Sequence, residues 1–274
     1  MLEEFRKRKF DIIVLIGQSN ASGSGLYKAG EEPAEDGDIL MLRNEYAATV
    51  KTSAYGNEYL DMSFSDKYEI SPASGDREGD TVKGNLIMTF AAEYKKHDLK
   101  AGRKILIVNA AIGGTGFSKN HWGVGDVLYE RMMKLTDMAL SLNPENRLAA
   151  FVWHQGEHDS YENAQFNYKE RNAFYYGKLT EMVKGIRAKY GVVPFISAAF
   201  TKIWHRDYKE QCDAVYAAIE RVAKENPAFA FIKDTEDLKC NDDVFGNKDV
   251  VHFCGNALNE LGRRYYRAYK AIVG

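Results

Sequence analysis

Short apolar segments alternate with longer amphipathic ones along this chain, and this alternation is the strongest constraint on its fold. Each apolar segment is bounded by turn-forming residues and is apolar at nearly every position, which is typical of strands buried on both faces. The five segments are residues 11–17, 104–111, 147–155, 192–200 and 228–234. Because strands that alternate with helices build parallel sheets, the pattern predicts a three-layer α/β/α fold with a mainly parallel central sheet of about five strands.

The expected helices lie between or after these strands. In residues 126–142, apolar side chains recur every three or four positions and form one stripe, as in a helix that packs against a sheet. Similar patterns occupy residues 162–190, 208–225 and 255–272. No linker, repeat or low-complexity segment interrupts the chain, so we expect one domain over residues 1–274.

Residues 22–80 break the alternation. This region is rich in Gly, Asp, Ser, Tyr and Glu, and within it only residues 38–43 have the pattern of a strand. Loops of this length in a compact domain are usually binding surfaces or lids. We therefore expect an insertion here that shapes the substrate site.

Composition narrows the classes of function. The net charge of −2 offers little to hold a nucleic acid, and the three cysteines lack the spacing of a disulfide framework or zinc site. The charged N-terminus leads into an apolar run without a small-residue cleavage site, which makes a poor signal peptide, and no segment is long enough to span a bilayer. A cytoplasmic protein without a membrane partner is the expectation, although a chain trimmed of an export signal would look the same.

Polar residues gather where the predicted strands end. Ligands of open parallel sheets bind beyond the carboxyl ends of the strands, and the first three strands end in GQSN (17–20), NAAIGGTGF (109–117) and WHQGEHD (153–159). A serine such as Ser19 becomes a nucleophile when an imidazole takes its proton. His252 follows Asp249 by three residues, and a carboxylate so placed can fix the imidazole tautomer.

The same strand ends supply hydrogen-bond donors. Acyl transfer builds negative charge on the former carbonyl oxygen, which rigid N–H groups stabilise. Gly113 and Gly114 can bring backbone amides close to a substrate, and Gln155 carries a side-chain amide. Taken alone, the glycines are better explained by an ordinary turn and Gln155 by a strand-end cap. Together with Ser19, they favour acyl transfer.

The four blocks GQSN, GGTGF, WHQGEHD and DVVHF, in this order over almost the whole chain, resemble the SGNH hydrolase superfamily. Within it they resemble the carbohydrate esterases that include sialate O-acetylesterases and acetylxylan esterases. The resemblance implies a flavodoxin-like fold, with Ser19 as nucleophile, His252 as base and Asp249 as its orienting carboxylate. The sequence departs from the family pattern at two places. Ala21 stands where a larger Met is common, and residues 83–85 stand where a Gly-Pro pair is common.

The resemblance also implies an oxyanion hole. The N–H of Ser19, the N–H of Gly113 or Gly114, and the Gln155 side chain would hold the developing negative charge. No cofactor or metal is implied.

Residues around these groups are expected to support the site. Gln18 and Asn20 flank the nucleophile in substrate-binding or supporting positions. We interpret Glu157 as a residue that positions Gln155 or the loop after it. Trp122 is a candidate for the wall of the acyl or sugar pocket, and plain packing explains it equally well.

The resulting hypothesis is a serine esterase that removes O-acetyl groups from carbohydrates, such as acetylated sialic acid, xylan or related sugars, through an acetyl-enzyme. One alternative is a zinc metallohydrolase, because HQGEH (154–158) matches the H-x-x-E-H pattern with His154 and His158 as ligands. However, two histidines four residues apart share a metal on a helix, and the segment before them has the pattern of a strand. Another alternative is a non-catalytic sugar-binding relative. The oligomeric state and the acetylated sugar stay open.

Overall fold

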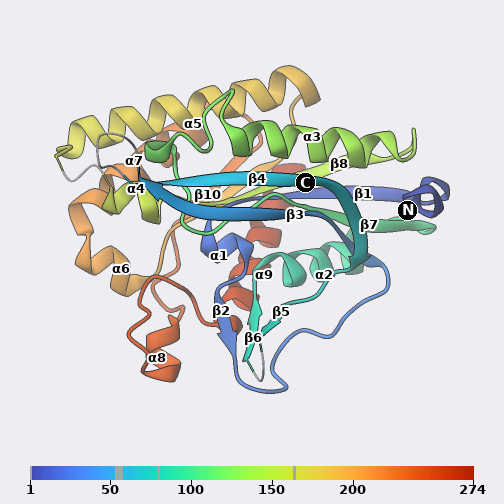
Figure 1. Cartoon of the computed structure of the whole chain (residues 1–274), viewed down its shortest axis with the longest axis horizontal. Coiled ribbons are helices and arrows are strands. Elements are labelled where there is room, and N and C mark those ends of the chain that lie inside the picture. The colour runs from blue at the N-terminus through green and yellow to red at the C-terminus, as the bar shows by residue number, and fades with distance from the viewer. Residues whose placement is uncertain (1, 53–57, 79–80, 163–164) are drawn as a thin grey trace.

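A mixed β-sheet runs through the middle of the molecule (Figure 1). The computed structural model describes residues 2–52, 58–78, 81–162 and 165–274. Within them, seven strands form the sheet in the order β10-β9-β8-β1-β7-β3-β4. Neighbouring strands are parallel except for β3 and β4, which are antiparallel. The strands are β1 (Lys9–Gly17), β3 (Ile39–Thr52), β4 (Glu58–Pro72), β7 (Arg103–Asn109), β8 (Arg147–His154), β9 (Phe195–Ala198) and β10 (Phe229–Ile232).

Helices cover both faces of this sheet, and alternate residues of β1 belong to the two cores. Ile12, Val14 and Ile16 pack with α3, α5 and α7 on one face, whereas Ile13 and Leu15 pack with α2 and α9 on the other. The predicted three-layer α/β/α fold is therefore confirmed. The helical segments are η1 (Glu3–Lys7), α1 (Ser19–Ser22), α2 (Ile87–His97), η2 (Phe117–Lys119), α3 (Val127–Ser141), α4 (Glu157–Tyr161), α5 (Tyr168–Tyr190), α6 (Lys202–Asp207), α7 (Lys209–Glu225), α8 (Asn241–Phe245) and α9 (Gly255–Val273).

The predicted strands and helices correspond closely to observed ones. The five predicted strands are β1, β7, β8, β9 and β10, and the sheet is larger than expected because β3 and β4 extend it. The four predicted helices are α3, α5, α7 and α9. Residues 163 and 164 of the predicted helix 162–190 lie outside the described residues, and the observed helix begins at Tyr168.

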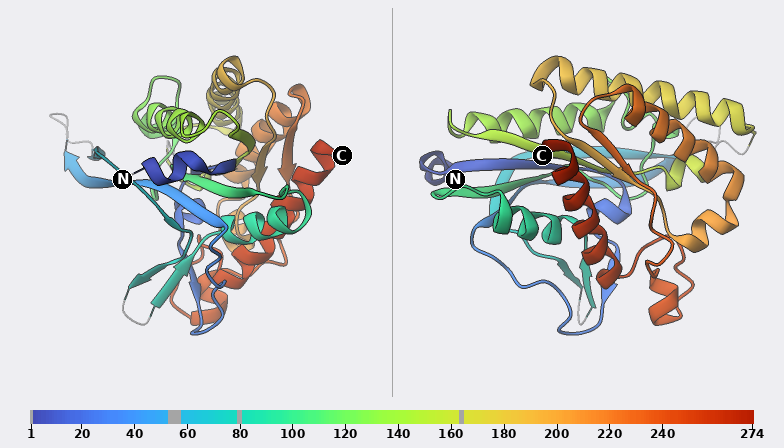
Figure 2. Two further views of the ribbon diagram at one scale, coloured as in Figure 1. Left: turned by 90° about the vertical axis from the view of Figure 1, so that its right-hand side faces the viewer. Right: turned by 180° about the vertical axis from the view of Figure 1, so that it is seen from behind.

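The expectation of a long irregular loop at residues 22–80 is wrong. Besides β3 and β4, the region contains β2 (Gly25–Tyr27) and β5 (Asp76–Glu78), which join β6 (Thr81–Gly84) in a small antiparallel sheet. Figure 2 shows this small sheet set apart from the main sheet. The outer half of β3, residues 45–52, is exposed. The sequence of β4 did carry a strand signal, because Leu60, Met62 and Phe64 alternate with polar residues, and the last two pack against the core. Residues 53–57 and 79–80 lie outside the described residues.

The carboxyl ends of the parallel strands place α1, α4 and α6 at one edge of the sheet. Gly17 permits the close approach of β1 and β8 there. Its φ is +126°, and a Cβ atom at this position would lie 2.1 Å from the carbonyl oxygen of His154. This edge therefore requires glycine directly before the polar segment that carries Ser19. Among the described helices, none is long and apolar enough to cross a membrane.

Candidate active site

Ser19, His252 and Asp249 form one line of hydrogen bonds. The Ser19 Oγ atom lies 2.8 Å from His252 Nε2, although the two residues are 233 positions apart in the chain. His252 Nδ1 lies 2.9 Å from Asp249 Oδ2. Ser19 opens α1 directly after β1, and the other two residues lie in the loop between α8 and α9. The fold therefore brings together the hydroxyl, imidazole and carboxylate that the sequence suggested.

The Asp249 carboxylate is held in its ionised form. Partial burial acts to raise its pKa, but hydrogen bonds from His252 and Asn241 outweigh this effect and lower the pKa below the usual value. The Asn241 amide donates to Asp249 Oδ2 at 2.8 Å and also to the Ser24 carbonyl oxygen at 3.0 Å. Sequence reasoning missed Asn241 because an asparagine at the start of a short helix has no distinctive pattern. An ionised Asp249 can stabilise a positively charged His252.

Ser19 and His252 lie at a cavity of about 330 Å³. Gly114 and the aromatic side chains of Tyr161 and Trp204 also line it, and the centroids of those two rings lie 6.4 Å apart. Trp204 lies in α6, just beyond β9. Ligands of open parallel sheets bind beyond the carboxyl ends of the strands. Because this rule also applies to the segment after β9, Trp204 could have been found from the sequence.

The turn after β7 places glycines beside the serine. A Cβ atom at Gly113 would lie 3.6 Å from Ser19 Cβ, and Gly114 has a φ of +70°. The N–H groups of Ser19, Gly113 and Gly114 have no hydrogen-bond acceptor in the described part of the chain. These groups are thus available to bind an oxygen atom near the Ser19 hydroxyl.

Comparison with known families identifies the chain. The family model described as carbohydrate esterase, sialic acid-specific acetylesterase, matches residues 9–271. The chain belongs to this family. It is therefore a carbohydrate esterase, a carboxylic ester hydrolase. No curated protein sequence is significantly similar to it.

Solved structures share the fold of this carbohydrate esterase. The structure of NanS is similar with a TM-score of 0.71 and 16% identity, covering 96% of this chain and 97% of that one. A protein from Arabidopsis thaliana has a TM-score of 0.68 and 21% identity, with 96% and 98% of the two chains covered. XAC1771, described as a carbohydrate acetylesterase from Xanthomonas citri, has a TM-score of 0.58 and 18% identity, with 96% of this chain and 56% of that one covered.

Gln155 lies behind the cavity of the esterase and not on its surface. Its side chain is wholly buried. Its Nε2 atom lies 2.6 Å from Asp159 Oδ2, 3.2 Å from Gln18 Oε1 and 3.3 Å from the Thr115 carbonyl oxygen. One N–H therefore binds Asp159 closely, and the other is shared between two long contacts.

Gln18 contacts Gln155 and itself lines the cavity. Its Oε1 atom also accepts from the N–H of His158 at 3.1 Å and that of Gly156 at 3.4 Å. These donors come from the start of α4, so Gln18 ties the segment before Ser19 to the segment after β8.

Asn20 holds the loop that carries His252. Its Nδ2 atom donates to the carbonyl oxygen of Val251 at 3.1 Å, and its Oδ1 atom accepts from the N–H of Phe253 at 3.0 Å. The Asn20 amide thus hydrogen-bonds to the backbone on both sides of His252. Because Asn20 is the neighbour of Ser19, the same residue fixes the nucleophile relative to its base.

Trp122 does not line the cavity that contains Ser19. Its side chain is fully buried and packs edge-on against Trp153 with ring centroids 5.3 Å apart. Its Nε1 atom donates to Thr115 Oγ1 at 2.9 Å. The packing interpretation of Trp122 therefore fits the structure, with Thr115 linking it to the turn that holds the glycines.

His154 and His158, the histidines of the zinc alternative, have different surroundings. His154 ends β8, is wholly buried and lies with Nδ1 3.0 Å from the Tyr265 hydroxyl and Nε2 3.3 Å from Glu157 Oε1. His158 lies in α4 with its Nε2 3.7 Å from Glu162 Oε1. Within the described residues, no three His, Cys, Asp or Glu side chains are grouped to hold a metal ion.

Proposed function

We propose that this carbohydrate esterase is a serine esterase that removes O-acetyl groups from a sugar through an acetyl-enzyme. The observation that carries the proposal is the line of hydrogen bonds from Ser19 through His252 to Asp249, with distances of 2.8 and 2.9 Å. A hydroxyl that donates to an imidazole held by a carboxylate has the arrangement needed for nucleophilic attack.

In the first step, His252 Nε2 takes the Ser19 proton while Ser19 Oγ attacks the acetyl carbonyl carbon. The tetrahedral intermediate then collapses, the bond to the sugar oxygen breaks, and His252 returns the proton to that oxygen. Water repeats the sequence on the acetyl-enzyme and releases acetate. Asp249 stabilises the imidazolium in both halves.

The oxyanion would be bound by the N–H of Ser19 and the N–H of Gly113 or Gly114, which the described chain leaves without acceptors. We propose Gln155 as a third donor. A charged oxygen is a stronger acceptor than the neutral oxygens of Gln18 and Thr115, which the second N–H of Gln155 contacts at 3.2 and 3.3 Å. The developing charge can therefore draw this N–H away from them.

The substrate class rests on two kinds of support. The family is described by its action on sialic acid, and XAC1771 is described as a carbohydrate acetylesterase. The cavity beside Ser19 adds the aromatic walls of Tyr161 and Trp204, which are suited to the apolar face of a sugar ring. Acetylated sialic acid, acetylated xylan and related sugars are the substrates to test.

The test is acetate release from p-nitrophenyl acetate and from these sugars by the wild type, Ser19→Ala and His252→Ala. Both variants should lose at least about 10³-fold in kcat. Ser141→Ala and His97→Ala, at exposed positions on α3 and α2, serve as matched controls and should keep wild-type rates. Wild-type rates in Ser19→Ala and His252→Ala would refute the mechanism.

A further inference from the structure

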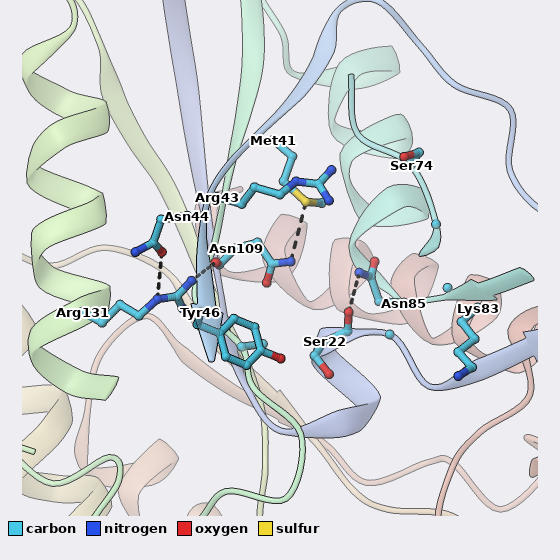
Figure 3. Close-up of a pocket in the computed structure, with 14 residues that line it drawn as sticks. Ser22, Met41, Arg43, Asn44, Tyr46, Ser74, Lys83, Asn85, Asn109 and Arg131 are labelled. Carbon is cyan, nitrogen blue, oxygen red and sulfur yellow. Dashed lines mark hydrogen bonds between the residues drawn. The ribbon is translucent and has the colours of Figure 1, made fainter. Parts of the chain in front are cut away.

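A second pocket adjoins the catalytic cavity, on the side of β3 and α3. Its volume is about 180 Å³, and Figure 3 shows Arg131 reaching into it from α3, with Ser22 and Lys83 on the opposite side. We call it the arginine pocket. Its lining residues are Ser22, Gly23, Met41, Arg43, Asn44, Tyr46, Ser74, Gly75, Lys83, Gly84, Asn85, Asn109, Ala111 and Arg131.

The charges that line this pocket are of one sign. Arg43, Lys83 and Arg131 contribute positive charge, and no described Asp or Glu is among the lining residues. The remaining polar groups are mainly amides, which can bind hydroxyl groups. Such a lining suits a ligand that carries both negative charge and hydroxyls.

Arg131 is buried, and no carboxylate of the described residues pairs with it. It is 8% exposed, its Nε donates to Asn44 Oδ1 at 3.0 Å, and its guanidinium lies over the ring of Phe64. Burial lowers its pKa to about 10, so the group is still charged at neutral pH. Its Nη1 atom is buried and has no hydrogen-bond partner within the described chain. A buried cation with an unused donor is costly unless a ligand supplies the missing acceptor.

Arg43 repeats this feature from β3. Its Nε atom is also buried and without a hydrogen-bond partner among the described residues. Each of the two arginines that line the pocket thus keeps one buried N–H donor without a partner among the described residues. Guanidinium groups bind planar carboxylates through paired hydrogen bonds, more specifically than a lysine does.

The pocket lies within the length of a sugar from the nucleophile. Ser22 lines the arginine pocket and Ser19 lines the catalytic cavity, and both belong to the single turn of α1. A Cβ atom at Gly113 would lie 3.6 Å from Ser19 Cβ and 3.9 Å from Ser22 Oγ. One helical turn spans about 5 Å, so the Ser22 side of the arginine pocket lies within reach of a sugar whose ester is at Ser19.

We infer that the arginine pocket binds the carboxylate of an acidic sugar while the acetyl ester of the same molecule lies at Ser19. The inference rests on the proposed function, and it adds to that function a separate anion-binding site at Arg43 and Arg131.

The test compares substrates that differ in this charge alone. O-acetylated sialic acid and O-acetylated glucuronic acid are each paired with the corresponding carboxamide, and acetate release gives kcat/KM for each. The wild type should prefer the acid over the carboxamide by about tenfold or more in at least one pair. Arg43→Gln should bring this ratio close to one, and Arg43→Lys should give an intermediate ratio. Lys134→Gln, which removes an exposed cation on the same helix as Arg131 but outside the pocket, should leave the ratio unchanged.

Inorganic phosphate distinguishes a free anion from the substrate's own carboxylate. If the inference holds, phosphate raises the apparent KM for the acid and leaves that for p-nitrophenyl acetate unaffected. Equal inhibition of both, or equal kcat/KM for acid and carboxamide in the wild type, would overturn it. Cleavage of p-nitrophenyl acetate without cleavage of either acidic sugar would also overturn it, while the proposed serine mechanism would stand. Loss of every activity in the wild type would instead refute the proposed function.

Discussion

Asn20 and Glu157 share a buried hydrogen bond in which Asn20 Nδ2 lies 2.7 Å from Glu157 Oε1. Asn20 is wholly buried and Glu157 nearly so, at 1% exposed. The bond joins the helix that begins with Ser19 to the helix that follows β8. Since Asn20 also binds the backbone on both sides of His252, Glu157 holds the residue that aligns nucleophile and base.

Asn20→Ala should slow catalysis without abolishing it. The loop that carries His252 would lose two hydrogen bonds, and misplacing a catalytic group by about 1 Å costs on the order of 100-fold in rate. We expect kcat on p-nitrophenyl acetate to fall about 10- to 100-fold with little change in KM. Asn172→Ala is the control, because it removes an asparagine bond to a carbonyl oxygen between α5 and α7 and should keep the wild-type rate. An unchanged kcat in Asn20→Ala would contradict this role.

Glu157→Gln should destabilise the protein in a manner that depends on pH. Burial acts to raise the pKa of Glu157, but His154 and the hydrogen bond from Asn20 outweigh it, so the pKa lies below its ordinary value of 4.5. A carboxylate with a lowered pKa stabilises the folded state above the unfolded pKa, and this contribution is lost as pH falls through the folded pKa. Glutamine also removes the charge that accepts the hydrogen bond from Asn20, and a hydrogen bond to a charged group contributes about 1.5–3 kcal/mol.

Urea unfolding at pH 7 and at pH 4 or below measures this effect. The difference in unfolding free energy between the wild type and Glu157→Gln should be large at pH 7 and should shrink as the pH falls further below 4.5. Glu225→Gln, at an exposed position on α7, should change stability little at either pH. A difference that stays constant with pH would mean that the charge of Glu157 is not the cause.

The Gln155→Leu variant tests whether Gln155 donates to the oxyanion or only supports its neighbours. If its second N–H binds the oxyanion, kcat should fall about 100- to 1000-fold with a small change in KM, as for other single donors. Tyr175→Phe is the matched control, because the Tyr175 hydroxyl binds Gln155 Oε1 at 3.0 Å and its loss leaves the Gln155 N–H groups in place. Equal losses of kcat in the two variants would argue that Gln155 only supports Gln18.

The parts of this protein that sequence reasoning found share a physical cause. Segments such as residues 147–155 are covered by helices on both faces, so their apolar character is continuous and easy to recognise. The motifs at the ends of these strands could be located because parallel strands bring their carboxyl ends to one edge. Ser19 followed from that rule, and His252 and Asp249 followed from their D-x-x-H spacing and from the family resemblance.

The parts that were missed depend on contacts between distant segments. The outer half of β3 is exposed, and this strand becomes evident only in its pairing with β4, where Leu60, Met62 and Phe64 alternate with polar residues. Asn241 acts through its bond to Asp249, and nothing local marks it. The arginine pocket is assembled from β3, β6, β7 and α3. Its unusual feature, two arginines that each keep a buried N–H donor without a described partner, exists only after folding.

Gly17→Ala tests whether the edge next to Ser19 depends on glycine. The new Cβ atom would lie 2.1 Å from the carbonyl oxygen and 2.7 Å from the carbonyl carbon of His154, and these backbone atoms are fixed in the neighbouring strand. The residue would also keep a φ of +126°, which side chains disfavour. We expect a loss of more than about 4 kcal/mol in unfolding free energy, or failure to fold.

Comparison with Gly30→Ala isolates the steric clash of the new Cβ atom from the cost of the backbone conformation. Gly30 also has a positive φ, +82°, but no atom lies within 4 Å of the position that a Cβ would take. Only the backbone cost of about 1–2 kcal/mol applies there. Urea unfolding of both variants measures the difference. Equal losses of unfolding free energy in Gly17→Ala and Gly30→Ala would mean that β1 can move away from His154. The close approach of β1 and β8 would then not fix the position of Ser19.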